Sequence, residues 1–207
     1  MTRVTSGAIL LIAFLVLGLT VSDTTPTIDR FAADALGGGW QQTIGDITFV
    51  VSAVLGPVLP VALGLALLVG AVLAHRRGDV ARRGLLLRAV VLLAVCRTVS
   101  LVKPLFARDR PREYPDFSFP SGHVVSVASV AFTLVVLCAW LAARRVRAVL
   151  WWSIAAVVVA ALCRMILDVH WLTDVLGATL GVVGLGLLTA TGLKLLPARP
   201  QGVKSPV

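Results

Sequence analysis

Residues 124–143 read VVSVASVAFTLVVLCAWLAA and are followed directly by Arg144 and Arg145. No charged side chain interrupts this stretch, and a helix of about 20 apolar residues is long enough to cross the hydrocarbon core of a bilayer. The stretch therefore predicts a membrane-spanning helix that ends at a pair of cations.

Five further apolar runs lie at residues 4–22, 48–74, 85–102, 148–162 and 173–195. The chain of 207 residues is 58% hydrophobic, whereas soluble domains are about 45–50% apolar. A soluble fold of this size could not bury so much apolar surface. We therefore predict one all-α domain over residues 1–207, a polytopic membrane protein with six transmembrane helices and a flexible tail at 197–207.

Three of these runs have special features. The run at 48–74 contains Gly56, Pro57 and Pro60. A kink is tolerable there if neighbouring helices cover the backbone carbonyl groups that lose their hydrogen bonds. The run at 148–162 is short unless the residues after it continue the helix. The first run follows Arg3 and could be a signal peptide, although it lacks a convincing small-x-small cleavage site. Its removal would leave the topology of the other helices unchanged.

Basic residues concentrate in alternate connections between the runs. They are Arg76, Arg77, Arg82, Arg83 and Arg88 after the second run, Arg144, Arg145 and Arg147 after the fourth, Lys194, Arg199 and Lys204 at the end, and Arg3 at the start. In a model with six spans, all of these basic segments lie on the same side of the membrane, and basic loops are usually cytoplasmic. We predict a cytoplasmic-membrane protein with both termini cytoplasmic, and the net charge of +9 then requires no nucleic-acid partner.

The first segment on the opposite side, residues 23–47, is net acidic. Thr25 and Pro26 are typical of a helix start. Apolar residues then recur at helical spacing before three glycines; they are Ile28, Phe31, Ala32, Ala35 and Leu36. This pattern predicts a short amphipathic helix that lies on the outer membrane surface.

The second segment on that side begins with the cations Lys103, Arg108 and Arg110, where cations are disfavoured. In one interpretation they form a solvated loop and pair locally with acidic residues, namely Asp109, Glu113 and Asp116. In the other they bind an anion, because lysine supplies a point charge and arginine a planar fork that grips two phosphate oxygens.

Ser121, Gly122 and His123 stand immediately before the fourth run. They could simply start a helix, with the histidine there by chance. Alternatively, the unpaired N–H groups of the helix N-terminus would attract an anion. Gly122 would permit its close approach and the Ser121 hydroxyl could donate to it. His123, with an unperturbed pKa of about 6.5, suits proton transfer.

Arg164, His170 and Asp174 connect the fifth and sixth runs. Residues four apart on a helix share one face. Asp174 could therefore accept one imidazole N–H of His170 and leave the other nitrogen as a nucleophile. For this pair alone a structural hydrogen bond is the simpler interpretation. Arg164 would be a further phosphate-binding cation.

The three clusters end different helix pairs but lie on the same side of the membrane. Charged groups at membrane depth are costly and usually functional. Together the clusters predict one shared phosphate site. The three cysteines, Cys96, Cys138 and Cys163, lie in or beside apolar runs without ligand spacing, which favours reduced thiols over a disulfide or a zinc site.

The clusters resemble the three signatures of the type 2 phosphatidic acid phosphatase family, Lys-x6-Arg-Pro, Pro-Ser-Gly-His and Ser-Arg-x5-His-x3-Asp. The chain carries them in the same order and spacing at 103–111, 120–123 and 163–174. The resemblance implies a six-span lipid phosphatase that needs no metal or other cofactor, and the sequence offers no carboxylate cluster to hold a metal.

The resemblance also implies a role for each matched residue. His170 would be the nucleophile that forms a phosphohistidine, Asp174 would orient it, and His123 would protonate the leaving oxygen and later help activate water. The phosphate oxygens would be bound by Lys103, Arg110, Ser121, Gly122 and Arg164.

Two residues stand apart from this pattern. Cys163 replaces the serine of the family, and a thiol is a weaker hydrogen-bond donor than a hydroxyl, so we expect reduced rather than abolished activity. Arg97 lies within the third run. It could contact the second phosphate of a diphosphate, but we favour snorkelling outward or pairing with Asp46 or Asp168.

The leading hypothesis is hydrolysis of a lipid phosphate at the outer face of the membrane. Candidate substrates are polyprenyl diphosphate (undecaprenyl diphosphate among them), phosphatidylglycerol phosphate and phosphatidic acid. The phosphohistidine could instead pass its phosphate to a lipid or sugar acceptor. A non-catalytic lipid-phosphate binder or transporter would keep the cations but would not need His123, His170 and Asp174. Membrane lipids are the only other partners expected, and no oligomeric state is predicted.

Overall fold

A computed structural model describes residues 2–36 and 38–196, and every regular element in these ranges is a helix. Six helical spans are long and apolar enough to cross a membrane, which confirms the predicted number. They are α1 (Arg3–Val21), α3 (Thr43–Ala53) joined to α4 (Leu59–Arg76), α5 (Val80–Arg97) joined to α6 (Lys103–Phe106), α7 (Gly122–Leu141), α8 (Val146–Ile166) and α9 (Leu172–Gly192). The predicted flexible tail lies outside the described residues, as do Arg199 and Lys204.

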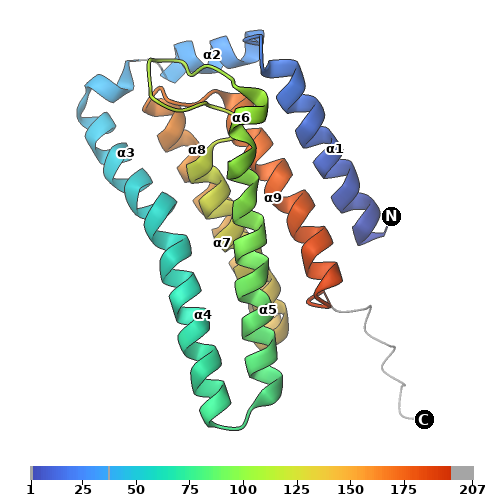
Figure 1. The fold of residues 1–207 in the computed structure, drawn as a ribbon. Helices are drawn as coiled ribbons and strands as arrows, with labels where there is room; N and C mark the ends of the chain where they lie inside the picture. The colour runs from blue at the N-terminus through green and yellow to red at the C-terminus, as the bar shows by residue number, and fades with distance from the viewer. Residues whose placement is uncertain (1, 37, 197–207) are drawn as a thin grey trace.

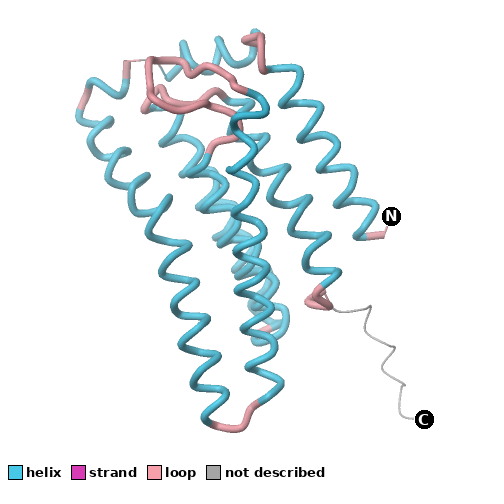
Figure 2. Tube along the Cα trace, in the orientation of Figure 1, coloured by secondary structure: helices cyan, strands magenta, loops and turns pink. Residues whose placement is uncertain are grey.

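The spanning helices run side by side in one bundle (Figure 1). The short helix α2 (Thr27–Leu36) lies across one end of it, beside the loop that connects α6 to α7. The turn between α4 and α5 lies at the opposite end. Most of the loop structure gathers at the α2 end (Figure 2). The three polar clusters therefore share one end of the bundle, as the sequence predicts.

Several spans are longer than their apolar runs. The third span continues through a 3-10 turn and α6 to Phe106, so Lys103 lies on the helical end of the span and not in a loop after it. The fifth span continues to Ile166 and so includes Arg164. Long basic side chains permit such extensions, because their aliphatic stems can lie among apolar groups while their charged ends reach polar surroundings.

The kink expected in the second span is a π-helical turn, Val54–Val58, between α3 and α4. Pro57 lacks the N–H that an α-helix needs at this point, and a π turn is one way to absorb the missing hydrogen bond. Gly56 in this turn lies against the ring of His123, and a Cβ at Gly56 would overlap the imidazole. The distorted turn therefore brings the second span directly against His123.

Helix α1 packs closely along α9. Gly7 and Gly184 face each other's backbone, and a Cβ on either residue would come to 3.0 Å from the carbonyl oxygen of the other. Small residues permit such close approach, on which helix association in lipid depends. Further along α1, the Phe14 ring stacks on the Phe119 ring at a centroid distance of 5.4 Å. Both contacts make α1 part of the packed bundle, and the signal-peptide alternative stays untested.

Helix α2 corresponds to the short helix predicted on the outer surface, and it buries a charged residue that the sequence analysis did not single out. Ile28 and Phe31 are 52% and 70% exposed, whereas Asp29 is completely buried. The carboxylate of Asp29 forms an ion pair inside the bundle, and this pair explains why α2 turns a charged residue inward. Ile28 and Phe31 are then available to the membrane interface.

Candidate active site

A cavity of about 470 Å³ lies at the α2 end of the bundle, between the 3-10 turn and α6 at the end of the third span, the loop after α6, and the ends of α7 and α8. Six of the eight predicted site residues line it: Lys103, Arg110, Gly122, His123, Arg164 and His170. The other two, Ser121 and Asp174, are completely buried and adjoin the lining residues in sequence or by contact. The fold therefore brings together residues from all three sequence clusters.

The cavity contains buried donors that lack an acceptor. Among the residues that the structure describes, neither the Ser121 hydroxyl nor the Nε of Arg164 has a hydrogen-bond partner. Ser121 is the N-cap of α7, but its side chain does not cap the helix. A buried donor without a partner costs free energy, so such groups usually meet a ligand or water. An anion with several acceptor oxygens matches donors arranged in this way.

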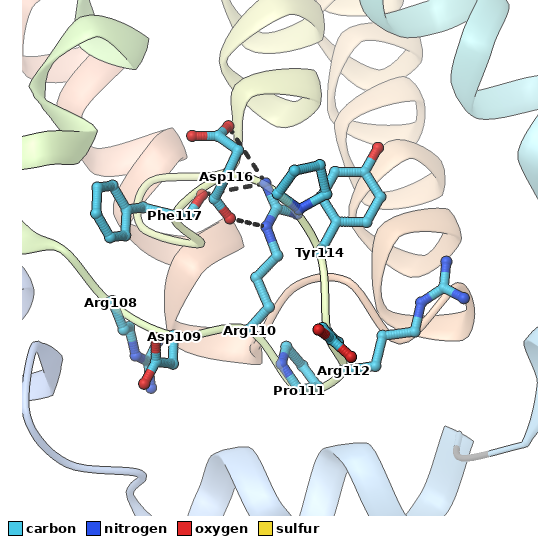
Figure 3. Close-up of a pocket in the computed structure, with 10 residues that line it drawn as sticks. Arg108, Asp109, Arg110, Pro111, Arg112, Tyr114, Asp116 and Phe117 are labelled. Atoms are coloured by element: carbon cyan, nitrogen blue, oxygen red, sulfur yellow. Dashed lines mark hydrogen bonds and ion pairs between the residues drawn. The ribbon is translucent and has the colours of Figure 1, made fainter.

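Two cations of the cavity share one carboxylate. Lys103 Nζ lies 2.5 Å from Asp116 Oδ2, and Arg110 Nη2 lies 3.4 Å from the same oxygen. Figure 3 shows Arg110 extended toward Asp116, and its guanidinium also lies 4.4 Å from the centroid of the Tyr114 ring. Partial burial disfavours the charged carboxylate, but the hydrogen bond and charge of Lys103 and the charge of Arg110 lower the pKa of Asp116. Asp116 therefore competes with any anion for these cations.

His170 contacts Asp174, but not in the predicted manner. His170 Nδ1 lies 3.3 Å from Asp174 Oδ2. However, His170 lies in the connection before α9, so the two residues do not share a helix face. Asp174 lies in the first turn of α9, and the same Oδ2 atom also accepts from the backbone N–H of Trp171 at 2.8 Å. The helix start, rather than the helical repeat, brings the pair together.

The contacts of His170 define its tautomer. Arg110 Nη1 lies 3.2 Å from His170 Nε2, and a guanidinium can only donate, so Nε2 accepts. Nδ1 then carries the proton that it donates to the Asp174 carboxylate. Complete burial lowers the pKa of His170 to about 3, although Asp174 opposes the shift. The imidazole is therefore neutral near pH 7, with the lone pair of Nε2 directed to the cavity lined by Arg110.

His123 lies on the first turn of α7 at the wall of the cavity. Within the described part of the chain its ring makes no hydrogen bond, so both nitrogens are available to a ligand.

Arg97 does not line this cavity. It also differs from the favoured interpretation, in which its side chain snorkels outward or pairs with Asp46 or Asp168. Its Nη1 donates to the Gly122 carbonyl at 3.2 Å and to the Ser126 hydroxyl at 2.5 Å. Arg97 therefore stabilises the helix turn that carries His123.

Arg108 is separate from the two cations of the cavity. It is only 2% exposed and lies between two carboxylates, with Nη2 at 2.7 Å from Asp29 Oδ2 and Nη1 at 2.6 Å from Asp174 Oδ1. The anion-binding interpretation of Arg108 is therefore wrong, because its fork is already occupied. The sequence analysis did not identify Asp29 or Thr173 as partners of Arg108. The pairing of Lys103 and Arg110 with Asp116 agrees with the interpretation in which the loop cations pair with nearby acidic residues.

Cys163 is 5% exposed and does not line the cavity. All three cysteines are unpaired, as the sequence predicts. The reduced activity expected from the thiol in place of a hydroxyl stays a prediction.

The fold and the cavity define a helical membrane protein in which two histidines and three basic side chains line one cavity. The sequence profile of the PAP2 superfamily matches residues 84–196. The chain therefore belongs to this superfamily, the type 2 phosphatidic acid phosphatases, and is a membrane phosphatase.

A solved structure supports the fold assignment. The chain is similar to a transmembrane PAP2-type phosphatidylglycerolphosphate phosphatase from Bacillus subtilis, with a TM-score of 0.67 and 20% sequence identity. The similarity covers 91% of this chain and 94% of the other. At this identity the likeness concerns the fold alone. A comparison with curated protein sequences finds no match.

Proposed function

We propose that the protein hydrolyses a lipid phosphate through a phosphohistidine on His170. One observation carries the proposal. His170 is a neutral imidazole whose Nδ1 is held by Asp174, and its Nε2, which accepts from Arg110, lies at a cavity that also contains the unpaired Nε of Arg164. A carboxylate that fixes the tautomer leaves a correctly directed lone pair on the opposite nitrogen, as nucleophilic catalysis requires.

The proposed reaction has two steps. In the first, Nε2 of His170 attacks phosphorus, an N–P bond forms, and the bond from phosphorus to the leaving oxygen breaks. His123 donates a proton to that oxygen. In the second step, water attacks phosphorus, gives its proton to His123, and the N–P bond breaks. Free phosphate and the neutral His170 are restored, so atoms and charges balance without a metal.

The remaining site residues would bind the phosphoryl oxygens. Lys103 and Arg110 would exchange Asp116 for the substrate, while Ser121, Arg164 and the N–H of Gly122 would donate to the other oxygens. Fixed donors of this kind stabilise the charge of the transition state without reorganisation.

The surroundings of the cavity support a lipid substrate. Leu101 and Pro104 belong to its lining. Leu101 and the nearby Leu105, at the end of the third span, are 73% and 75% exposed. An acyl or prenyl chain could therefore lie in the bilayer while its phosphate enters the cavity. The relative from Bacillus subtilis is a phosphatidylglycerolphosphate phosphatase, which makes this lipid the first to test, beside polyprenyl diphosphate and phosphatidic acid.

The arginine-rich turns support an extracytoplasmic site. The end of the bundle opposite the cavity carries Arg76, Arg77, Arg82 and Arg83 in the turn from α4 to α5. Such clusters favour the cytoplasm. We therefore propose that both termini are cytoplasmic and that the cavity opens at the outer face of the cytoplasmic membrane.

The proposal is tested by release of free phosphate from the three lipids, with purified protein in detergent and a chelator present. We expect chelator-resistant release from the wild type and none from His170→Ala. A substrate with radioactive phosphate should also label the wild-type protein covalently, with a label that is lost in acid and kept in base. Equal release by His170→Ala would refute the mechanism. Labelled acceptor without free phosphate would instead indicate phosphotransfer, and binding without turnover would indicate a lipid-phosphate binder.

A further inference from the structure

Helix α2 contributes a completely buried carboxylate next to the proposed catalytic pair. Asp29 is 0% exposed, although it lies in the first turn of a helix that covers the end of the bundle. Its Oδ1 accepts from the backbone N–H of Thr173 at 2.8 Å, and its Oδ2 accepts from the Thr173 hydroxyl at 2.6 Å. Oδ2 also accepts from Arg108 Nη2 at 2.7 Å. Asp29 therefore accepts three hydrogen bonds, two from Thr173 in the first turn of α9 and one from Arg108 in the loop between α6 and α7.

Arg108 transmits these contacts to Asp174. Its Nη1 donates to the Thr173 hydroxyl at 2.7 Å and to Asp174 Oδ1 at 2.6 Å. The other oxygen of Asp174, Oδ2, is the one that faces His170. Because Arg108 holds one carboxylate oxygen, it fixes the rotation of the Asp174 side chain. The position of the oxygen that orients His170 thus depends on Arg108, and the position of Arg108 depends on Asp29.

Charge balance gives Asp29 a second effect on the same pair. A guanidinium buried between two carboxylates leaves one net negative charge on the group. Without the charge of Asp29, Asp174 alone would neutralise Arg108. Asp174 would then be a poorer acceptor for the Nδ1 proton of His170, and Nε2 would be a poorer nucleophile. Geometry and electrostatics therefore act in the same direction.

We propose that Asp29 is a positioning residue that acts through Arg108 and Thr173 on Asp174, and thereby on the nucleophilic nitrogen of His170. The inference rests on the proposed function and deepens it. It makes α2, which lies outside the matched residues 84–196, a part of the catalytic unit. A purely anchoring role for Asp29 would predict a loss of stability without a specific loss of turnover.

The test compares Asp29→Asn with the matched control Asp34→Asn, whose carboxylate is exposed on the same helix. Asparagine keeps the shape and one acceptor oxygen, but it removes the charge and puts an NH2 group in place of the second acceptor. We expect kcat for Asp29→Asn to fall about 10- to 100-fold, as for a small misplacement of reacting groups, with KM nearly unchanged. Asp34→Asn should match the wild type. A wild-type kcat in Asp29→Asn, even with a lowered melting temperature, would overturn the proposal.

A second variant covers the case in which Asp29→Asn does not fold. Thr173→Val keeps the backbone N–H that donates to Asp29. It removes the hydroxyl that bridges Asp29 and Arg108 beside their direct ion pair. We expect a smaller loss of kcat in the same direction, with the elution profile and melting temperature of a folded protein. Unchanged kcat in folded Thr173→Val would also overturn the proposal.

Binding of orthovanadate separates this inference from the proposed function. Vanadate mimics five-coordinate phosphorus and needs a well-placed nitrogen, whereas inorganic phosphate needs mainly the cations. Calorimetry should show vanadate binding weakened about 10-fold or more in Asp29→Asn, with phosphate binding changed less than about 3-fold. If the wild type releases no phosphate from any lipid but shows this difference, the proposed function fails and the positioning role stands. Equal vanadate affinity would overturn the positioning role.

Discussion

A neutral, buried imidazole makes the stability of the protein depend on pH. Burial lowers the pKa of His170 to about 3 in the folded protein, whereas the pKa of an unfolded histidine is about 6.5. Between these values the unfolded chain binds a proton that the folded protein does not. The contribution of His170 to stability is therefore complete above about pH 6.5 and is lost as the pH falls toward about 3.

His170→Gln removes this proton linkage. The free energy of unfolding of the wild type should fall more steeply than that of His170→Gln as the pH is lowered from about 6.5, by at most about 1.4 kcal/mol per pH unit, and the melting temperature should follow the same trend. Above about pH 7.5 the two curves should run parallel. Thermal unfolding in detergent across this range measures both slopes. Identical slopes would show that the folded imidazole protonates as readily as the unfolded one.

Asp116 gives a second prediction about single residues, because its carboxylate occupies the cations that the substrate phosphate would use. Asp116→Asn should tighten competitive inhibition by inorganic phosphate about 2- to 5-fold, the range expected for a partly exposed ion pair. Inhibition constants at fixed pH measure the effect. Glu113→Gln, an exposed acid on the same loop, serves as the control and should change little. Weaker inhibition in Asp116→Asn would mean that Asp116 assists the anion rather than competing with it.

At the scale of elements, the π-helical turn between α3 and α4 supports His123. A Cβ at Gly56 would overlap the His123 ring, so Gly56→Ala must displace the imidazole. We expect kcat to fall about 10- to 100-fold with a small change in melting temperature. Gly64→Ala on α4 is the control, because the Cβ there would meet only Leu93 Cδ2 at 3.9 Å. Normal turnover in Gly56→Ala would imply that the position of His123 is not critical.

The sequence predicted the elements better than their junctions. Uninterrupted apolar runs identified six spans, and the spacing of Lys103, Arg110, His123 and His170 marked one site. The cavity lined by these residues brings the clusters together. The sequence did not predict that His170 precedes α9, because a helix start between two residues four apart leaves no clear signal in a Trp-Leu-Thr sequence.

The partners of Arg108 were also not predictable. Asp29 lies far from it in the chain, on the short helix α2. A buried ion pair between distant segments depends on how α2 docks on the bundle, and local patterns carry no information on docking. The pairing of Lys103 and Arg110 with Asp116 differs in this respect, because Asp116 is close to both in the sequence and was one of their expected acidic partners.

The whole molecule is electrically asymmetric. One end carries the arginines of the α4–α5 turn and Arg144, Arg145 and Arg147 between α7 and α8. The other end carries the cavity, α2 and its acidic residues. Three basic residues of the cavity end are held by carboxylates, Lys103 and Arg110 by Asp116 and Arg108 by Asp29 and Asp174. The arginine clusters at the opposite end are the kind of charge that orients a multi-span protein during insertion.

This asymmetry predicts the topology in cells. A cysteine introduced at Gly78, in the α4–α5 turn, should resist a membrane-impermeant thiol reagent in intact cells and react after permeabilisation. A cysteine at Gly38, in the connection after α2, should react in intact cells. Both glycines have positive φ, and their Cβ positions meet no atom within 4 Å, so the substitutions cost local strain without steric conflict. Replacing the three native cysteines by alanine removes background labelling. Labelling of Gly78→Cys but not of Gly38→Cys in intact cells would invert the topology and put the cavity on the cytoplasmic side, where substrates made inside the cell would reach it without crossing the membrane.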